Sequence, residues 1–151
     1  MTDSRLALAA ATFALGLCAA ATPASAQPAA PLDHSTPLGI AQAWLEAFLG
    51  GDADQAGALS ALPFALDGKR VVEARDELDA VYRSRRASPV PPGAYATVAE
   101  WPPFEPRDLP PQCRPVQPAC SLVRFALDGS REAVYIFVDT RSAARVVGFR
   151  D

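Results

Sequence analysis

Three apolar runs at the C-terminal end constrain the fold of this chain more than any other feature. They are SLVRFAL, REAVYIFVD and ARVVGFRD, at residues 121–127, 131–139 and 144–151. Because Asp128-Gly129 joins the first two and the polar DTRSA joins the last two, the runs predict an antiparallel meander. Val123 and Phe125 alternate with Arg124, which predicts that the first strand has one buried face and one solvent-exposed face. The middle run is apolar on both faces, so it is expected at the centre of its sheet.

Helical spacing marks three segments that precede this meander. They are STPLGIAQAWLEAFLGG, ADQAGALSAL and EARDELDAVYRSRR, at residues 35–51, 53–62 and 73–86. Ser35 or Thr36 is the expected N-cap of the first helix, and Gly50 with Gly51 ends it. Asp52 is the expected N-cap of the second helix. The third helix is expected to point Leu78, Val81 and Tyr82 inward, with charges on its other faces.

The pentapeptide FALDG occurs twice, at residues 64–68 and 125–129. In both copies Asp-Gly lies between apolar runs, and glycine accepts a positive φ at little cost, so both copies are predicted to be hairpin tips. The flanking sequences differ, whereas a duplication would align further. We therefore interpret the repeat as the same turn sequence occurring independently at two places, and not as an internal duplication. Asp67 and Asp128 are accordingly assigned to turns and not to a ligand site.

Ten of the chain's 15 prolines fall between Pro89 and Pro118 and interrupt regular structure there. Within this region AYATVAEW, at residues 94–101, can supply one short strand. Cys113 and Cys120 also lie here, and in an oxidising compartment such a pair predicts a disulfide. A bridge across a loop of about eight residues contributes roughly 2 to 2.5 kcal/mol. The alternative of a redox or metal pair lacks both the C-x-x-C spacing and further ligands, so no metal site is expected.

Residues 1–26 have the features of a secretory signal peptide. Arg5 precedes an apolar run that is too short to span a bilayer comfortably. Ala24 and Ala26 form the A-x-A pattern that signal peptidase reads, so we expect cleavage after Ala26 and a periplasmic or secreted product. Two alternatives stay open, a lipoprotein signal ending at Cys18 and an uncleaved membrane anchor.

Removal of residues 1–26 leaves a chain of the right size for one domain. We expect a linker over 27–34 and a single domain over 35–151, with a Pro-rich, disulfide-closed insertion at about 88–120. The removed segment carries one acidic and one basic residue, so the formal net charge of the chain, -3, is unchanged. The one tight basic cluster lies at the end of a predicted helix, where cations suit the helix dipole. It comprises Arg83, Arg85 and Arg86. Nucleic-acid binding and a second membrane span are therefore not expected.

The order helix, helix, hairpin, helix and closing meander resembles the NTF2-like superfamily, also called SnoaL-like or ketosteroid-isomerase-like, with a cystatin-like α+β fold. Three segments carry the resemblance: AQAWLEAFLGGDADQAGAL, PFALDGKRVVEARDEL and YIFVDTRSAARVVGFRD. The resemblance implies N-terminal helices packed in a curved antiparallel sheet that forms a cone. It also implies a pocket in the cone, which members use for catalysis, binding or assembly. The Pro-rich insertion is not a typical feature of the family.

Catalytic members of this family place an acid or base inside the cone, usually Asp, His or Tyr. His34 is predicted to be a solvated linker residue, and Asp139 is interpreted as a turn-former although it is the best-placed carboxylate. The carboxylates of the third helix are expected to face solvent: Asp76, Glu77 and Asp79. Six aromatic residues are candidates to line a pocket and would serve equally well as core: Trp44, Phe48, Tyr82, Tyr95, Trp101 and Tyr135.

Three classes of function remain. The first is an exported, non-catalytic module without a cofactor that binds a small apolar ligand or a partner protein of the cell envelope. An apolar cavity without convergent ionisable groups would support this class. The second is an acid-base enzyme of isomerase, cyclase or dehydratase type acting on a small apolar molecule, and it requires a buried carboxylate beside Tyr or Trp. The third is a structural protein whose cone is filled by Trp44 and Phe48. Association of two copies through the sheet stays open.

Overall fold

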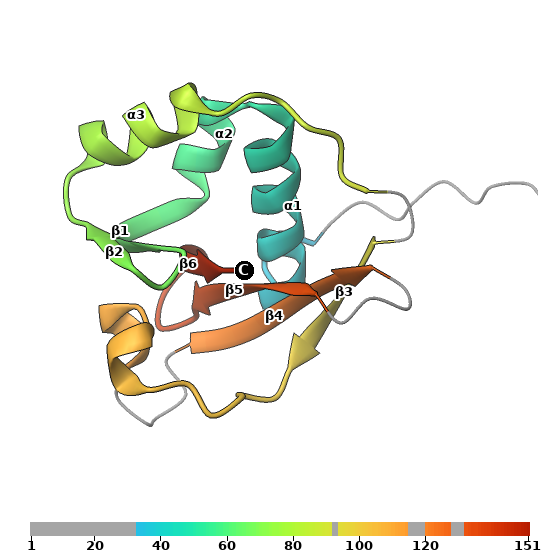
Figure 1. Ribbon diagram of the computed structural model, residues 1–151, viewed down its shortest axis with the longest axis vertical. Coiled ribbons are helices and arrows are strands. Elements are labelled where there is room, and N and C mark those ends of the chain that lie inside the picture. Colours follow the sequence, from blue (N-terminus) through green and yellow to red (C-terminus); the bar gives the residue numbers. More distant parts are fainter. Residues whose placement is uncertain (1–32, 92–93, 115–119, 128–131) are drawn as a thin grey trace, which may run out of the picture. The chain divides into compact units, whose positions relative to one another are not determined.

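The computed structural model describes residues 33–91, 94–114, 120–127 and 132–151. Within these residues three α-helices accompany a six-stranded mixed sheet, so the α+β class is confirmed (Figure 1). The helices are α1 (Pro37–Gly50), α2 (Ala53–Ala58) and α3 (Arg75–Ser84). The strands are β1 (Ser60–Leu66), β2 (Arg70–Val72), β3 (Ala94–Ala99), β4 (Cys120–Leu127), β5 (Ala133–Asp139) and β6 (Arg145–Arg150). Two 3-10 turns, η1 (Pro106–Asp108) and η2 (Pro111–Cys113), lie between β3 and β4.

The predictions for the N-terminal segment, including cleavage after residue 26, concern residues outside the described ranges. Among the helices that the structure describes, none is long and apolar enough to cross a membrane.

The strands lie in the order β2-β1-β6-β5-β4-β3. All neighbours are antiparallel except β1 and β6, which run parallel, so the expectation of a wholly antiparallel sheet is wrong and the sheet is mixed. Strands β3 to β6 form one continuous antiparallel meander, and its last three strands are those predicted from the sequence. The central position of β5 is also confirmed, because β5 lies between β6 and β4 and its Ile136, Phe137 and Val138 are fully buried.

Helix α1 begins and ends with the predicted signals. The Thr36 hydroxyl accepts a hydrogen bond from the Gly39 N–H at 3.0 Å, and Pro37 opens the helix. Gly51 closes it with a left-handed φ of 78°. Gly39 is needed because an added Cβ would lie 2.0 Å from the Asp33 carbonyl oxygen. The chain can therefore fold back tightly at the entrance to α1.

Helix α2 is shorter than predicted, and the prediction that it runs through residue 62 is wrong. Asp52 caps it as expected, but the helix ends at Ala58 and the chain continues as β1 from Ser60. The spacing of Leu59 and Leu62 fits a helix as well as a strand. Burial of Ser60 in the core favours the strand. Pro63 lies inside this strand, where it has no N–H to donate. The pairing of β1 with β6 is accordingly irregular between Ser60 and Ala65.

The first FALDG copy is the tip of the β1–β2 hairpin, as predicted. Asp67 and Gly68 both adopt positive φ, at 51° and 61°. The turn is closed by a hydrogen bond of 3.0 Å from the Lys69 N–H to the Leu66 carbonyl oxygen. In the second copy, residues 128 and 129 lie outside the described ranges, while the flanking strands β4 and β5 are paired antiparallel.

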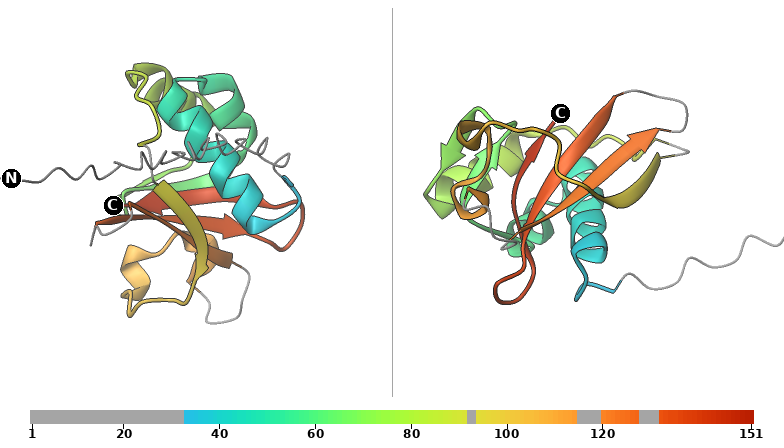
Figure 2. Two further views of the ribbon diagram at one scale, coloured as in Figure 1. Left: turned by 90° about the vertical axis from the view of Figure 1, so that its right-hand side faces the viewer. Right: turned by 90° about the horizontal axis from the view of Figure 1, so that it is seen from below.

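The helices and the described part of the Pro-rich region lie on opposite faces of the sheet (Figure 2), and each face carries a hydrophobic core. The helices cover one face, where Trp44 of α1 and Leu78 of α3 pack against Val123 and Ile136 of the sheet. The described part of the Pro-rich region lies against the other face. Its core there contains Cys113, Cys120, Leu122, Phe137 and Val147.

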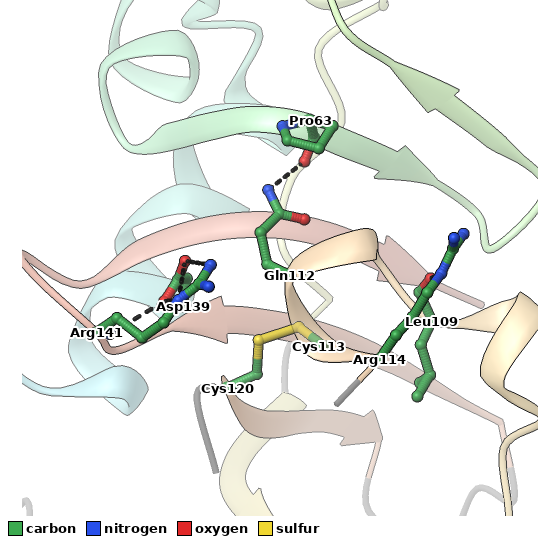
Figure 3. Close-up of a disulfide and its surroundings, with 8 residues drawn as sticks. All are labelled: Pro63, Leu109, Gln112, Cys113, Arg114, Cys120, Asp139 and Arg141. Atoms are coloured by element: carbon green, nitrogen blue, oxygen red, sulfur yellow. Dashed lines mark hydrogen bonds and ion pairs between the residues drawn. A yellow bond between two sulfur atoms is a disulfide. The ribbon is translucent and has the colours of Figure 1, made fainter. Parts of the chain in front are cut away.

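The Pro-rich region is attached to the sheet by covalent and polar contacts. The predicted disulfide joins Cys113, at the end of η2, to Cys120, at the start of β4, with the two Cα atoms 5.5 Å apart (Figure 3). The Gln112 amide nitrogen donates to the Pro63 carbonyl oxygen of β1 at 2.6 Å. In β6, Gly148 allows close packing, because an added Cβ would lie 2.8 Å from the Ala65 carbonyl oxygen of β1 and 3.1 Å from Pro110. The segment therefore thickens the face of the sheet opposite the helices.

Candidate functional site

A pocket of about 800 Å³ lies between α1, the segment that follows α3 and the end of the sheet where β4 leads to β5. Apolar side chains form much of its lining: Trp44, Leu45, Phe48, Leu49, Val90, Phe125, Val134 and Phe149. Arg85, Glu132 and Asp151 contribute charged groups, and all three are exposed. The volume lies within the range of about 300 to 1,000 Å³ that is usual for small-molecule sites.

Aromatic rings form the inner wall of the pocket. Trp44 stacks on Phe48 with ring centroids 4.6 Å apart, and Phe149 of β6 lies 5.3 Å from Phe48. Phe64 and Tyr82 pack behind Trp44 at 5.9 and 6.4 Å. Trp44 is fully buried, so the deep part of the space between the helices and the sheet is filled by side chains. The pocket occupies the unfilled space between α1 and the sheet, at the end of the sheet where β4 leads to β5.

The polar atoms behind this wall are satisfied within the protein. The Trp44 Nε1–H donates to the Ser60 hydroxyl at 3.0 Å and to the Tyr82 hydroxyl at 3.2 Å. The Ser60 hydroxyl donates to the Ala56 carbonyl oxygen at 2.7 Å and lies 2.7 Å from the Tyr82 hydroxyl. Burial raises the pKa of Tyr82 to about 12. A phenol with this pKa and these contacts is poorly suited to proton transfer near neutral pH, so its role is to join α3 to α1 and β1.

The six aromatic candidates for the pocket lie in different parts of the structure. Trp44 and Phe48 line the pocket, and Tyr82 lies behind its wall. Tyr135 borders the pocket, but its ring packs against Phe104 in the core on the other face of the sheet, with ring centroids 5.6 Å apart. Tyr95 is 44% exposed and contacts Arg124, whose pKa it raises through a hydrogen bond. Trp101 is 42% exposed and packs on Phe137, with ring centroids 5.8 Å apart. Neither of these two residues lines the pocket.

Two candidate carboxylates are held in turns. The backbone N–H of Arg141 donates to the Asp139 carboxylate at 3.0 Å, and the Arg141 guanidinium also donates to it (Figure 3). These hydrogen bonds lower the pKa of Asp139. Hydrogen bonds from Asp151 and Lys69 lower the pKa of Asp67 to about 2. Asp139 is thus stabilised as an anion by its turn, Asp67 is stabilised by Asp151 and by its turn neighbour Lys69, and neither lines the pocket.

The remaining candidates also lie away from the pocket. His34 and Asp76 are exposed, and Asp79 lies 3.9 Å from Arg83. Glu77 forms an ion pair with Arg70. Asp128 is outside the described residues. In the part of the chain that the structure describes, Ser60 is the sole buried polar or charged residue, and no cluster of three or more His, Cys, Asp or Glu could hold a metal ion.

Several lining residues were not singled out as pocket candidates from the sequence. The alternation in β4 and β5 places Phe125 and Val134 on the face toward the helices, so strand periodicity contains part of this information. From the sequence, Arg85 belongs to the basic cluster at the end of the third predicted helix. Its position beside Phe48 depends on the path of the chain after α3, for which the local sequence has no signal.

Comparison with protein-family models, curated proteins and solved structures found no match to this chain. Its class is therefore defined by the fold and the pocket alone. It is an α+β domain with a mixed six-stranded sheet and a largely apolar pocket beside its first helix.

Proposed function

We propose that this protein is an exported, non-catalytic binding module of the NTF2-like type that holds a small apolar ligand in the pocket beside α1. The observation that carries this proposal is the pocket of about 800 Å³, whose lining is rich in aromatic and aliphatic side chains. Burial of apolar ligand surface against such a lining is favourable by about 25 cal/mol per Å² before the cost of association is subtracted.

The order of elements supports the NTF2-like part of the proposal. Two helices, the β1–β2 hairpin, a third helix and the β3–β6 meander follow one another along the chain. This is the order on which the family resemblance rests. The Cys113–Cys120 bridge supports export, because disulfides persist in oxidising compartments.

The distribution of ionisable groups favours binding over acid-base catalysis. A general acid or base needs a pKa near the working pH, which burial or a charged neighbour usually provides. The two carboxylates in the lining, Glu132 and Asp151, are exposed. A hydrogen bond with Asp67 raises the pKa of Asp151, but this carboxyl stays in contact with water. The one phenol held at the back of the pocket, Tyr82, has its pKa raised to about 12.

Calorimetric titration with decanol tests the proposal. The mature protein should bind decanol, and Val134→Phe should weaken binding by roughly tenfold or more, because the larger ring occupies the pocket. Leu49→Phe, on the opposite wall, should act in the same way. Val98→Phe is the matched control, since Val98 is a strand residue that does not line the pocket.

Circular dichroism and thermal unfolding establish that each variant is folded. Absence of decanol binding by the wild-type protein would contradict the proposal. Equal weakening by Val134→Phe and Val98→Phe would place the ligand elsewhere, and binding only of an envelope protein would favour the partner-binding alternative.

A further inference from the structure

Among the described residues that line the pocket, Arg85 is the single cation. It follows α3 directly, and its backbone N–H donates to the Tyr82 carbonyl oxygen at 3.2 Å. Its guanidinium lies over the ring of Phe48, with the central carbon 3.8 Å from the ring centroid. Nearby, the Ser88 N–H donates to the Leu49 carbonyl oxygen at 2.6 Å and ties this segment to the end of α1. The cation is thus placed at the pocket wall by both elements.

No described protein group uses the hydrogen-bonding capacity of this guanidinium. Within the described part of the chain, Arg85 has no carboxylate within 4.0 Å and its side chain has no hydrogen-bond acceptor, whereas Arg70, Arg141 and Arg150 each pair with a carboxylate. The carbonyl oxygens of Ala47 and Leu49 at the end of α1 are bonded to backbone N–H groups. An arginine presents five N–H donors in a planar fork that fits a carboxylate.

The charges in the lining are separated between its two sides. Arg85 lies on the helical side, while Glu132 and Asp151 lie just before the start of β5 and just after the end of β6. The backbone N–H of Asp151 donates to the Asp67 carboxylate at 3.3 Å, which ties this end of β6 to the β1–β2 turn. Between the two sides lie apolar side chains, including Phe125 and Val134.

We infer that the pocket selects apolar ligands that end in a carboxylate, with the head group bound by the Arg85 guanidinium and the chain against Phe125 and Val134. This inference rests on the proposed function and narrows it to aliphatic monocarboxylates. Charge-assisted bonds from the guanidinium fork orient the head group, and the apolar lining accepts the chain.

Three probes of equal chain length test the inference: decanoate, decanol and decyltrimethylammonium. Binding is followed by tryptophan fluorescence in a Trp101→Phe background, which leaves Trp44 at the pocket wall as the single tryptophan. Decanoate should bind about tenfold more tightly than decanol. Arg85→Gln should reduce the ratio of decanoate to decanol affinity to about one, and Arg85→Lys should retain part of the preference because the charge remains without the fork.

Arg86→Gln is the matched control, because Arg86 is the exposed neighbour of Arg85 and does not line the pocket. It should preserve the preference for decanoate. Equal binding of decanoate and decanol, a preference that survives Arg85→Gln, or tighter binding of the ammonium probe would each overturn the inference while leaving the proposed function intact. Failure of all three probes to bind would overturn both.

Discussion

Ser60 links three elements through one buried hydroxyl group. It is the first residue of β1, and it connects Trp44 of α1, Tyr82 of α3 and the Ala56 carbonyl oxygen of α2. Each of these polar groups would lose a partner in the core if the hydroxyl were removed, and unsatisfied buried groups cost about 1 to 3 kcal/mol. The network therefore fixes the wall of the pocket. It also gives Trp44 and Tyr82, both pocket candidates from the sequence, a structural role.

Tyr82 should make the protein less stable at alkaline pH. An unfolded tyrosine titrates near pH 10, and burial raises the pKa of Tyr82 in the folded state to about 12. Because the folded state holds this proton more tightly, the free energy of unfolding is unaffected below about pH 10. It falls by roughly 2 to 3 kcal/mol as the pH rises through about 12.

Urea unfolding of the wild-type protein and of Tyr82→Phe at about pH 9 and about pH 11 measures this effect. The advantage of the wild-type protein over Tyr82→Phe should shrink, or reverse, at the higher pH. A difference between the two proteins that does not change with pH would show that Tyr82 does not titrate as its burial implies.

Gly68→Ala tests the backbone requirement of the β1–β2 hairpin. The residue has a φ of 61°, and an added Cβ would meet its nearest neighbour at 3.4 Å, which is ordinary contact. The expected cost of about 1 kcal/mol therefore comes from the left-handed backbone and not from a clash. Gly50→Ala is the control, because its added Cβ has no neighbour within 4 Å and its φ is not positive. Equal thermal midpoints for the two variants would contradict the assignment.

Removal of the disulfide should destabilise the Pro-rich region without unfolding the sheet. The double variant Cys113→Ala and Cys120→Ala should lower the free energy of unfolding by about 2 kcal/mol, because the unfolded chain loses its closed loop. Urea unfolding measures the loss, and far-UV circular dichroism checks that the strands persist. Unchanged stability, or two free thiols in the exported wild-type protein, would be inconsistent with a structural bridge.

Elements with strong local signals are those that the sequence predicts well. Helix α1 has its cap at Thr36 and its stop at Gly51, and the meander has alternation that places Val123 inward. The change from α2 to β1 was not predicted, because the spacing of Leu59 and Leu62 also fits a helix. The parallel contact of β1 with β6 joins Ser60 to Val146, and such distant pairing has no signature in either strand alone.

At the scale of the whole molecule, the pocket is formed by parts that are far apart in the sequence. Trp44 and Phe48 can be predicted as pocket candidates from the sequence, because they are large aromatic residues in the first predicted helix. Arg85 and Phe149 come from the segment after α3 and from the last strand, and their meeting beside α1 is a consequence of tertiary packing. Sequence reasoning therefore identified part of the aromatic wall and missed the cation.

The proposal of export predicts a mature protein that begins at Gln27. The Ala24 and Ala26 pattern motivates this cleavage site. The intact mass of protein recovered from the periplasm of a bacterial host should equal that of residues 27–151. A product that keeps residues 1–26, or that carries a lipid on Cys18, would contradict the prediction.

The most direct test of the binding account is a nuclear magnetic resonance titration of the methyl groups with decanol. Binding in the pocket predicts shift changes for Leu45, Leu49 and Val134, which line it, while Val98 and Leu109, which do not, stay unchanged. Shift changes centred on Val98 or Leu109, or the absence of saturable changes at the lining residues, would contradict the claim that this pocket binds an apolar ligand.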